Sequence, residues 1–295
     1  METPSSAETA GSRSAAGVTS AGAPIRIGQV VLTVRDMEAV SRFYQDVVGL
    51  RVLETGDAGC TLGAGATPLL ELWRDPDARR DDPRSAGLFH TAFLLPSRAD
   101  LAAWMTHAAD GGVHVEGASD HLVSEAFYLS DPEGNGVEIY ADRPSETWEK
   151  RDGMIAMATA QLDLASLAAA STGGWTGAPE GSIIGHVHLR VGALAGAESF
   201  YGGALGLDIA CRYPGATFFG SGGYHHHIAA NVWRSSGAQM RPAGTTGLAE
   251  VRLIANAGQM EAIRSRTALE PAVESAPDRL SRRDPWGTSI IVTSV

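Results

Sequence analysis

Residues 26–34 read RIGQVVLTV, and residues 183–191 read IIGHVHLRV, so each stretch places a glycine before a polar residue and a run of mostly apolar side chains. The likeness continues downstream, where SRFYQDVVGLRV at 41–52 corresponds to ESFYGGALGLDI at 198–209 in the second half. The spacing between the copies is the same in both pairs. Self-similarity at a fixed spacing is typical of a repeat architecture. The chain is therefore predicted to contain two related halves.

The first half opens with a strand predicted at 25–34, where residues that face one way alternate with residues that face the other. Asp36 is placed to cap the following helix, which carries an apolar stripe and ends at Gly49. Three short strands are expected next, around 51–54, 60–62 and 69–73. Together these elements predict one βαβββ unit.

A second unit of the same kind begins at residue 87. A strand is predicted at 87–96, and Ser97 with Asp100 forms a capping box for the helix that follows. The turn DPEGNG at 131–136 joins the last two strands. The three closing strands are predicted near 113–116, 126–130 and 137–140.

Four such units in two pairs predict an α+β protein with two domains, at 25–145 and 181–295. Residues 1–24 have almost no large apolar side chains and are predicted to form a disordered tail. Residues 146–180 contain a helix-prone Ala/Leu run and a Gly/Pro-rich end. They are predicted to form a linker that packs on one of its neighbours.

Composition narrows the class of protein. The 44% hydrophobic and 19% charged residues indicate a globular fold, and no apolar run is long enough to span a membrane. A net charge of −11 argues against a nucleic-acid surface, which needs a basic patch. Cys60 and Cys211 are too few for a disulfide framework and fit a reducing compartment, so a cytoplasmic location is expected.

Side chains that could carry chemistry gather between residues 87 and 143. His90 lies on the strand that opens this region, Glu138 lies on the strand that closes it, and His121 and Tyr128 lie between them. Two potential ligands on neighbouring strands, with a histidine and a tyrosine nearby, suit a metal-assisted reaction on an oxygen-rich substrate. The alternative is that His90 and Glu138 satisfy each other as a buried pair.

The chain resembles the vicinal oxygen chelate superfamily, which includes glyoxalase I, the extradiol ring-cleaving dioxygenases, and the bleomycin and fosfomycin resistance proteins. A narrower resemblance, to the two-domain catechol 2,3-dioxygenase-like proteins of bacteria, is carried by GLFHTAFLLPSRADL at 87–101, GASDHLVSEAFYLSDPEGNGVEIYADRP at 117–144 and GYHHHI at 223–228. The resemblance covers everything after the tail. It implies that paired units curl into a cup, with metal ligands pointing inward from four strand positions.

Extradiol dioxygenases place two histidines and a glutamate at three of these positions, which lets iron(II) take substrate and dioxygen together. Carried over by resemblance, the positions are Gln29, His90 and Glu138. His121 and Tyr128 resemble the family's histidine and tyrosine that assist proton transfer and hold the catecholate. Gln29 stands where a dioxygenase has histidine, and this departure is predicted to weaken iron-dependent ring cleavage.

A second ligand set follows from resemblance to glyoxalase I, in which a carboxylate is supplied from the fourth position. Glu71 occupies that place, so Gln29, Glu71, His90 and Glu138 would form an oxygen-rich set. Such a set suits zinc, nickel, cobalt or manganese acting as a Lewis acid. The alternative for Glu71 is a solvated carboxylate at a strand edge.

The second half is predicted to be the weaker metal site. His186 stands at its first ligand position, with His188 on the same face of the strand, but Ile291 replaces the closing carboxylate. We therefore expect this half to be structural or to shape the substrate pocket.

The run from His225 to His227 is the remaining candidate. On a regular strand, His225 and His227 face one side and His226 the other, so the three cannot chelate one ion. A structural or pocket-lining role is predicted for the run, with His225 and His227 as the pocket residues, and ligation or proton transfer is the alternative.

The leading hypothesis is a metal-dependent, extradiol dioxygenase-like enzyme acting on a small aromatic or oxygen-rich molecule. Iron(II) is the expected metal, with zinc, nickel and manganese as alternatives. The competing functions are a glyoxalase-like lyase or isomerase, and a non-catalytic protein that sequesters a small molecule such as an antibiotic. A small-molecule substrate is the expected partner, with no nucleic acid and no membrane, and a homo-oligomer is left open.

Overall fold

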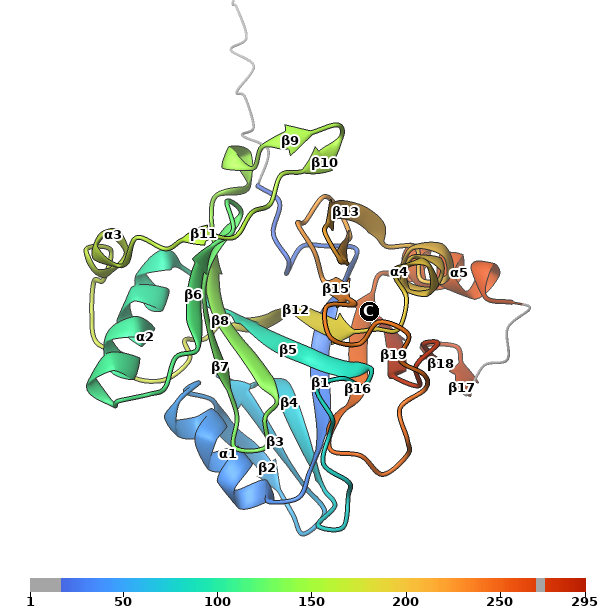
Figure 1. Ribbon diagram of the computed structural model, residues 1–295, viewed down its shortest axis with the longest axis horizontal. Coiled ribbons are helices and arrows are strands. Elements are labelled where there is room, and N and C mark those ends of the chain that lie inside the picture. The colour runs from blue at the N-terminus through green and yellow to red at the C-terminus, as the bar shows by residue number, and fades with distance from the viewer. Residues whose placement is uncertain (1–16, 269–273) are drawn as a thin grey trace, which may run out of the picture.

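Two curved sheets carry the fold in the computed structural model, which describes residues 17–268 and 274–295 (Figure 1). One sheet has the strand order β17-β18-β19-β16-β1-β4-β3-β2, and the other has the order β11-β6-β7-β8-β5-β12-β15-β14-β13. Helices lie on the outside of the strands, with α1 and α2 on one side of the molecule and α4 and α5 on the other (Figure 1).

Four βαβββ units build these sheets. The first consists of β1 (Ile25–Val34), α1 (Met37–Asp46), β2 (Arg51–Thr55), β3 (Gly59–Ala64) and β4 (Thr67–Arg74). The second consists of β5 (Gly87–Leu94), α2 (Arg98–Asp110), β6 (Gly117–Asp120), β7 (Ser124–Ser130) and β8 (Gly136–Asp142).

The other two units follow in the second half. The third consists of β12 (Ile183–Arg190), α4 (Leu194–Ala197), its π-helical continuation η2 (Glu198–Ala204), β13 (Asp208–Tyr213), β14 (Ala216–Gly220) and β15 (Ile228–Asn231). The fourth consists of β16 (Gly247–Ala255), α5 (Ala257–Arg266), β17 (Glu274–Ala276), β18 (Arg279–Arg283) and β19 (Ser289–Ser294). The α+β class and the fourfold repeat are confirmed.

The predicted strand at 113–116 is displaced in the structure. Its place in the ladder is taken by β6, which begins at Gly117 opposite Tyr128. Residues 113–116 instead lead from the end of α2 to the sheet, and their Val113 and Val115 side chains pack against the core.

The pairing of the units decides where a site can form. Strand β1 pairs with β16, and β5 pairs with β12, both antiparallel. Each sheet therefore joins one unit from each half: the first with the fourth, and the second with the third. The sheets do not follow the predicted domains at 25–145 and 181–295, because main-chain hydrogen bonds cross from one half to the other within each sheet.

A repeated tyrosine ties the units of each half together. Tyr44 of α1 donates a hydrogen bond to Asp131 in the last turn of the second unit, and Tyr201 donates to Asp284 in the equivalent turn of the fourth unit. Both tyrosines are fully buried. One continuous apolar core, which includes Trp104, then runs through both halves.

The segments outside the units are held against them. Residues 1–16 of the predicted tail lie outside the described residues, but Val18 donates its backbone N–H to Ser145 at 2.8 Å and Ser20 is buried. The predicted linker contains η1 (Ser145–Thr147), β9 (Lys150–Arg151), β10 (Met154–Ile155), β11 (Ala160–Gln161) and α3 (Leu164–Ala168). Strand β11 extends the second sheet by pairing with β6, and α3 lies beside α2. None of the described helices is long and apolar enough to cross a membrane.

Close approach of β8 to β5 provides a test of this packing. A Cβ on Gly136 would lie 2.0 Å from the carbonyl oxygen of Phe89, and backbone cannot move aside as a side chain can. We expect Gly136→Ala to lower the free energy of unfolding by about 1–3 kcal/mol, as overpacking typically does. Urea denaturation measures this loss. Gly56→Ala is the control, because no atom lies within 4 Å of the added methyl group. Equal stability of the two variants would contradict the close packing.

Candidate metal centre

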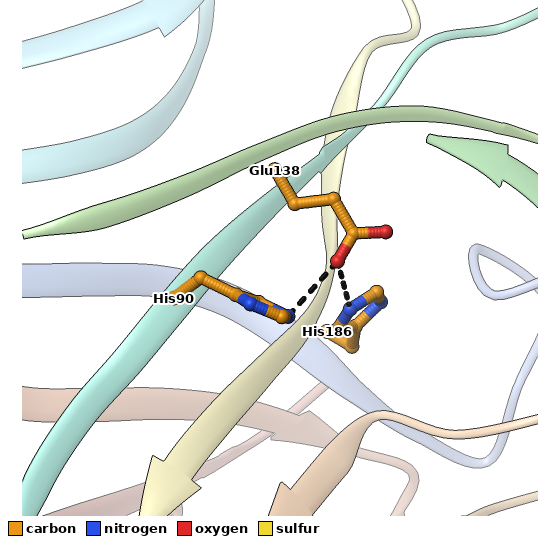
Figure 2. A group of neighbouring side chains, drawn as sticks. All are labelled: His90, Glu138 and His186. Atoms are coloured by element: carbon orange, nitrogen blue, oxygen red, sulfur yellow. Dashed lines mark hydrogen bonds and ion pairs between the residues drawn. The ribbon is translucent and has the colours of Figure 1, made fainter. Parts of the chain in front are cut away.

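Three buried side chains from three neighbouring strands converge on one point (Figure 2). His90 comes from β5, Glu138 from β8 and His186 from β12. Glu138 Oε2 lies 2.9 Å from His90 Nε2 and 3.1 Å from His186 Nε2, and the three donor atoms are all within 4.8 Å of one another. Because β5 lies between β8 and β12 in the sheet, side chains on one face of these strands necessarily meet.

Burial sets the charge states in this group. The three residues are only 6%, 2% and 2% exposed. Burial raises the pKa of Glu138, but the neighbouring imidazoles of His186 and His90 outweigh it and hold that pKa well below its usual range. Burial lowers the pKa of His186 to about 4, against the opposing influence of Glu138. At neutral pH the group therefore contains a carboxylate and a neutral His186, the forms that bind metals.

The chemistry of the donor set fits a divalent cation. His90 Nε2 is buried and, although close to Glu138, makes no hydrogen bond of acceptable geometry. A buried polar atom without a partner costs free energy, and ligation of a cation would remove that cost. Two imidazoles and one carboxylate that leave other positions open are typical of non-haem iron(II) sites.

The predicted catalytic pair lies beside the converging group, with the rings of His90 and Tyr128 5.5 Å apart between centroids. His121 Nδ1 is 2.6 Å from the carbonyl oxygen of Ala158, and His121 Nε2 is 2.6 Å from the hydroxyl of Tyr128. Since a carbonyl only accepts, Nδ1 carries the proton, and Nε2 accepts from the tyrosine O–H. Burial raises the pKa of Tyr128 well above its usual range, and the nearby Glu138 raises it further, so the phenol stays protonated. The linker thus supplies the carbonyl that orients His121.

The converging group, His121 and Tyr128 line a cavity of about 480 Å³. Its walls also include aromatic side chains such as Phe89, Phe218 and Trp233. This volume is within the range typical of small-molecule sites.

The structure does not bring Gln29 and Glu71 to His90 and Glu138. They lie on β1 and β4 of the other sheet, where Arg252 Nη1 donates to Gln29 Oε1 at 2.6 Å and to Glu71 Oε2 at 2.5 Å. The physical reason is the register, because β1 pairs with β16 and Arg252 lies directly opposite Gln29. Glu71 is also not the isolated, solvated carboxylate considered from the sequence.

His186 takes the third place in the group instead, although the sequence suggested a structural or substrate-shaping role for its half of the chain. Its signal was present in the sequence, since His186 aligns with Gln29 in the repeat. Only the pairing of β5 with β12 reveals that it faces His90. His188, two residues further on, lines the same cavity and accepts a hydrogen bond from Asn231 Nδ2 at 3.0 Å.

The three adjacent histidines precede β15 and are not part of a regular strand. His225 Nε2 lies 2.9 Å from Asp142 Oδ1, and its Nδ1 lies 2.7 Å from Nδ1 of His226. His226 is the one that lines the cavity, with its ring centroid 4.1 Å from that of His186, and the sequence prediction missed it. His227 is fully buried, and burial lowers its pKa to about 3.

Comparison with known proteins identifies the class to which this fold and site belong. The family model described as the Glyoxalase/Bleomycin resistance protein/Dioxygenase superfamily matches residues 26–139 and 183–284. The chain belongs to this superfamily, which is the one that its sequence resembles.

Particular relatives narrow the similarity. The chain is 42% identical over 228 residues to a catechol-2,3-dioxygenase of Bacillus subtilis, an alignment that spans 75% of this chain and 80% of the relative. It is 30% identical over 132 residues to a biphenyl-2,3-diol 1,2-dioxygenase of Rhodococcus globerulus, spanning 44% of this chain and 70% of the relative. The solved structure of glyoxalase I from Zea mays shares the fold, with a TM-score of 0.56, 17% identity and 92% coverage of each chain.

Proposed function

We propose that this protein is an iron(II)-dependent extradiol dioxygenase that opens the ring of a catechol beside its two hydroxyl groups. The observation that carries the proposal is the convergence of His90, Glu138 and His186 on the cavity wall, with an Nε2 of each histidine within 3.1 Å of Glu138 Oε2. The similarity to two ring-cleaving dioxygenases supports it.

His90, Glu138 and His186 would hold the metal, and the metal when bound supplies open positions at which a catechol and dioxygen meet. The surrounding residues handle protons. Tyr128 can receive a hydrogen bond from a catechol hydroxyl while its own O–H points to His121 Nε2, so the pair can accept the proton that the substrate loses. The aromatic walls of the cavity exclude water from the reacting atoms.

His226 adds a further imidazole to the lining of the cavity, beside His186. Burial, reinforced by neighbouring histidines, lowers the pKa of His226 well below its usual range, so the ring is neutral. With Nδ1 of His226 directed to Nδ1 of His225, and Nε2 of His225 directed to Asp142, the free lone pair of His226 resides on Nε2. We assign His226 as a second proton-handling group.

The test is anaerobic reconstitution with iron(II), followed by addition of catechol and air. Oxygen uptake together with a yellow ring-fission product is the expected result, and the metal-free protein and the zinc-loaded protein are the controls. Catechol binding without oxygen uptake under any metal would replace the proposal with a sequestering protein. A glyoxalase-like activity is not favoured, because Arg252 engages both Gln29 and Glu71.

Gln29→His provides a separate test of which residues hold the metal. If Gln29 were a weak ligand, histidine at this position would raise iron affinity and turnover. Because Gln29 is hydrogen-bonded to Arg252 in the other sheet, we expect iron content and kcat to stay within about twofold of wild type. Iron analysis and oxygen uptake measure both quantities. A clear gain in either would restore Gln29 to the ligand set.

A further inference from the structure

The cavity continues along β12 beyond the metal centre. His186, His188 and Arg190 alternate along this strand and all line the cavity. The Cα atoms of His186 and Arg190 are separated by about 13 Å, the length of four residues in an extended strand. A substrate bound at His186 therefore has a cationic side chain at the far end of the same wall.

Arg190 is buried there in an unusual electrostatic setting. It is only 7% exposed, it pairs with Asp81 through Nη2, and its Nε has no hydrogen-bond partner. Asp81 is also influenced by a second guanidinium, that of Arg241, which is bonded to the carbonyl oxygens of Thr246 and Leu248. The carboxylates of Asp82 and Asp284 also act on this cluster, so what Arg190 offers the cavity is its unpartnered Nε.

The mouth of the cavity adds a further cation and two aromatic rings. Arg234 lines the cavity, and within the described ranges no ion pair engages it. The neighbouring Trp233 is 47% exposed and Phe89 is 38% exposed, with ring centroids 5.5 Å apart. Glu116 is the exposed carboxylate of the lining, and it lies away from this end of the cavity. It precedes β6, and three strands (β7, β8 and β5) separate β6 from β12. The arginines and the aromatic pair therefore share one end.

We propose that this end of the cavity, formed by Arg190, Arg234, Phe89 and Trp233, selects catechols whose ring substituent ends in a carboxylate. The inference rests on the proposed function, because the metal fixes the catechol end. The apolar part of the substituent packs on Phe89 and Trp233, and its carboxylate binds the guanidinium groups. Guanidinium–carboxylate hydrogen bonds are charge-assisted and stronger than neutral ones.

Two compounds of the same shape test the proposal: 3,4-dihydroxyphenylacetate and its neutral amide. Binding of each to the anaerobic iron-loaded protein is measured by calorimetry, and turnover is measured separately by oxygen uptake. We expect the carboxylate to bind roughly tenfold to a hundredfold more tightly than the amide. Added salt should weaken this preference. Equal affinity for the two compounds would overturn the proposal.

Variants locate the preference. Arg234→Gln should reduce the affinity ratio severalfold, and the paired substitution Arg190→Gln with Asp81→Asn should reduce it further without leaving a buried carboxylate unpaired. Arg84→Gln is the matched control, since it removes a surface charge near Asp81 that pairs with Asp82 and does not line the cavity. An unchanged ratio in folded Arg234→Gln and in the paired variant would overturn the proposal. If the preference for the carboxylate holds but neither compound is cleaved, the binding subsite stands and ring cleavage fails.

Discussion

His186→Ala is expected to release the metal as completely as His90→Ala. Each variant removes one of three donors, and the remaining imidazole and carboxylate would bind a divalent ion at least about a hundredfold more weakly, since changes merely around ligands already cost tenfold to a hundredfold. Ring cleavage should fall below detection in both. The measurement is iron per chain after anaerobic loading and desalting, with circular dichroism to verify folding.

His114→Ala is the control for this experiment, because His114 is an exposed histidine outside the cavity. The sequence predicted a site contained in the first half, in which His186→Ala would leave the metal in place. Iron retained by His186→Ala but lost from His90→Ala would therefore return the centre to one half of the chain.

Local sequence patterns were sufficient for the elements and for part of the site. Alternating strands, capped helices and Gly-rich turns are short-range features, and they predicted the four units. His90, His121, Tyr128 and Glu138 fall within one unit, so their proximity follows from that unit's own hairpins and its parallel β5–β8 pair. The proximity of these four residues needed no knowledge of the other half.

The third member of the converging group depends on long-range pairing that leaves no local trace. All four units begin with a strand of similar apolar pattern, and nothing in β5 itself indicates whether its antiparallel partner is β1 or β12. The structure pairs β5 with β12, which places His186 at the centre. The linker had a similar ambiguity: its composition predicted packing on a neighbour, but not that Ala158 would orient His121.

A comparison of the two sheets explains why, among the residues that the structure describes, one sheet holds a convergent centre and the other does not. In one ladder His186 lies opposite Ala92, and in the other the equivalent Gln29 lies opposite Arg252. The methyl group of Ala92 leaves space between the histidines, whereas the guanidinium of Arg252 fills the corresponding space and binds the surrounding oxygen atoms. In this sheet the guanidinium of Arg252 thus supplies the positive charge that a metal ion would supply in the other sheet.

Substitution of His121 or Tyr128, the proposed proton-transfer pair, is the second change for which we expect a large loss of kcat. His121→Gln keeps a polar side chain but removes the basic nitrogen. Tyr128→Phe removes the hydroxyl that donates to His121 Nε2 and that, in the proposed function, would accept a hydrogen bond from the substrate. Because a positioned acid–base group contributes about 10²–10⁴-fold to rate, we expect kcat to fall by at least about a hundredfold in each variant. Iron content should remain, since neither residue belongs to the converging group.

The decisive comparison is between kcat and binding. Anaerobic titration with catechol should give a dissociation constant within about tenfold of wild type for His121→Gln, because the metal and the aromatic walls remain. His114→Gln again serves as the control. If the two residues act as one unit, the double variant should be little slower than either single variant, whereas independent roles would multiply the losses. A variant that loses affinity and kcat in equal proportion, or loses its iron, would show that the pair supports the shape of the cavity and does not transfer a proton.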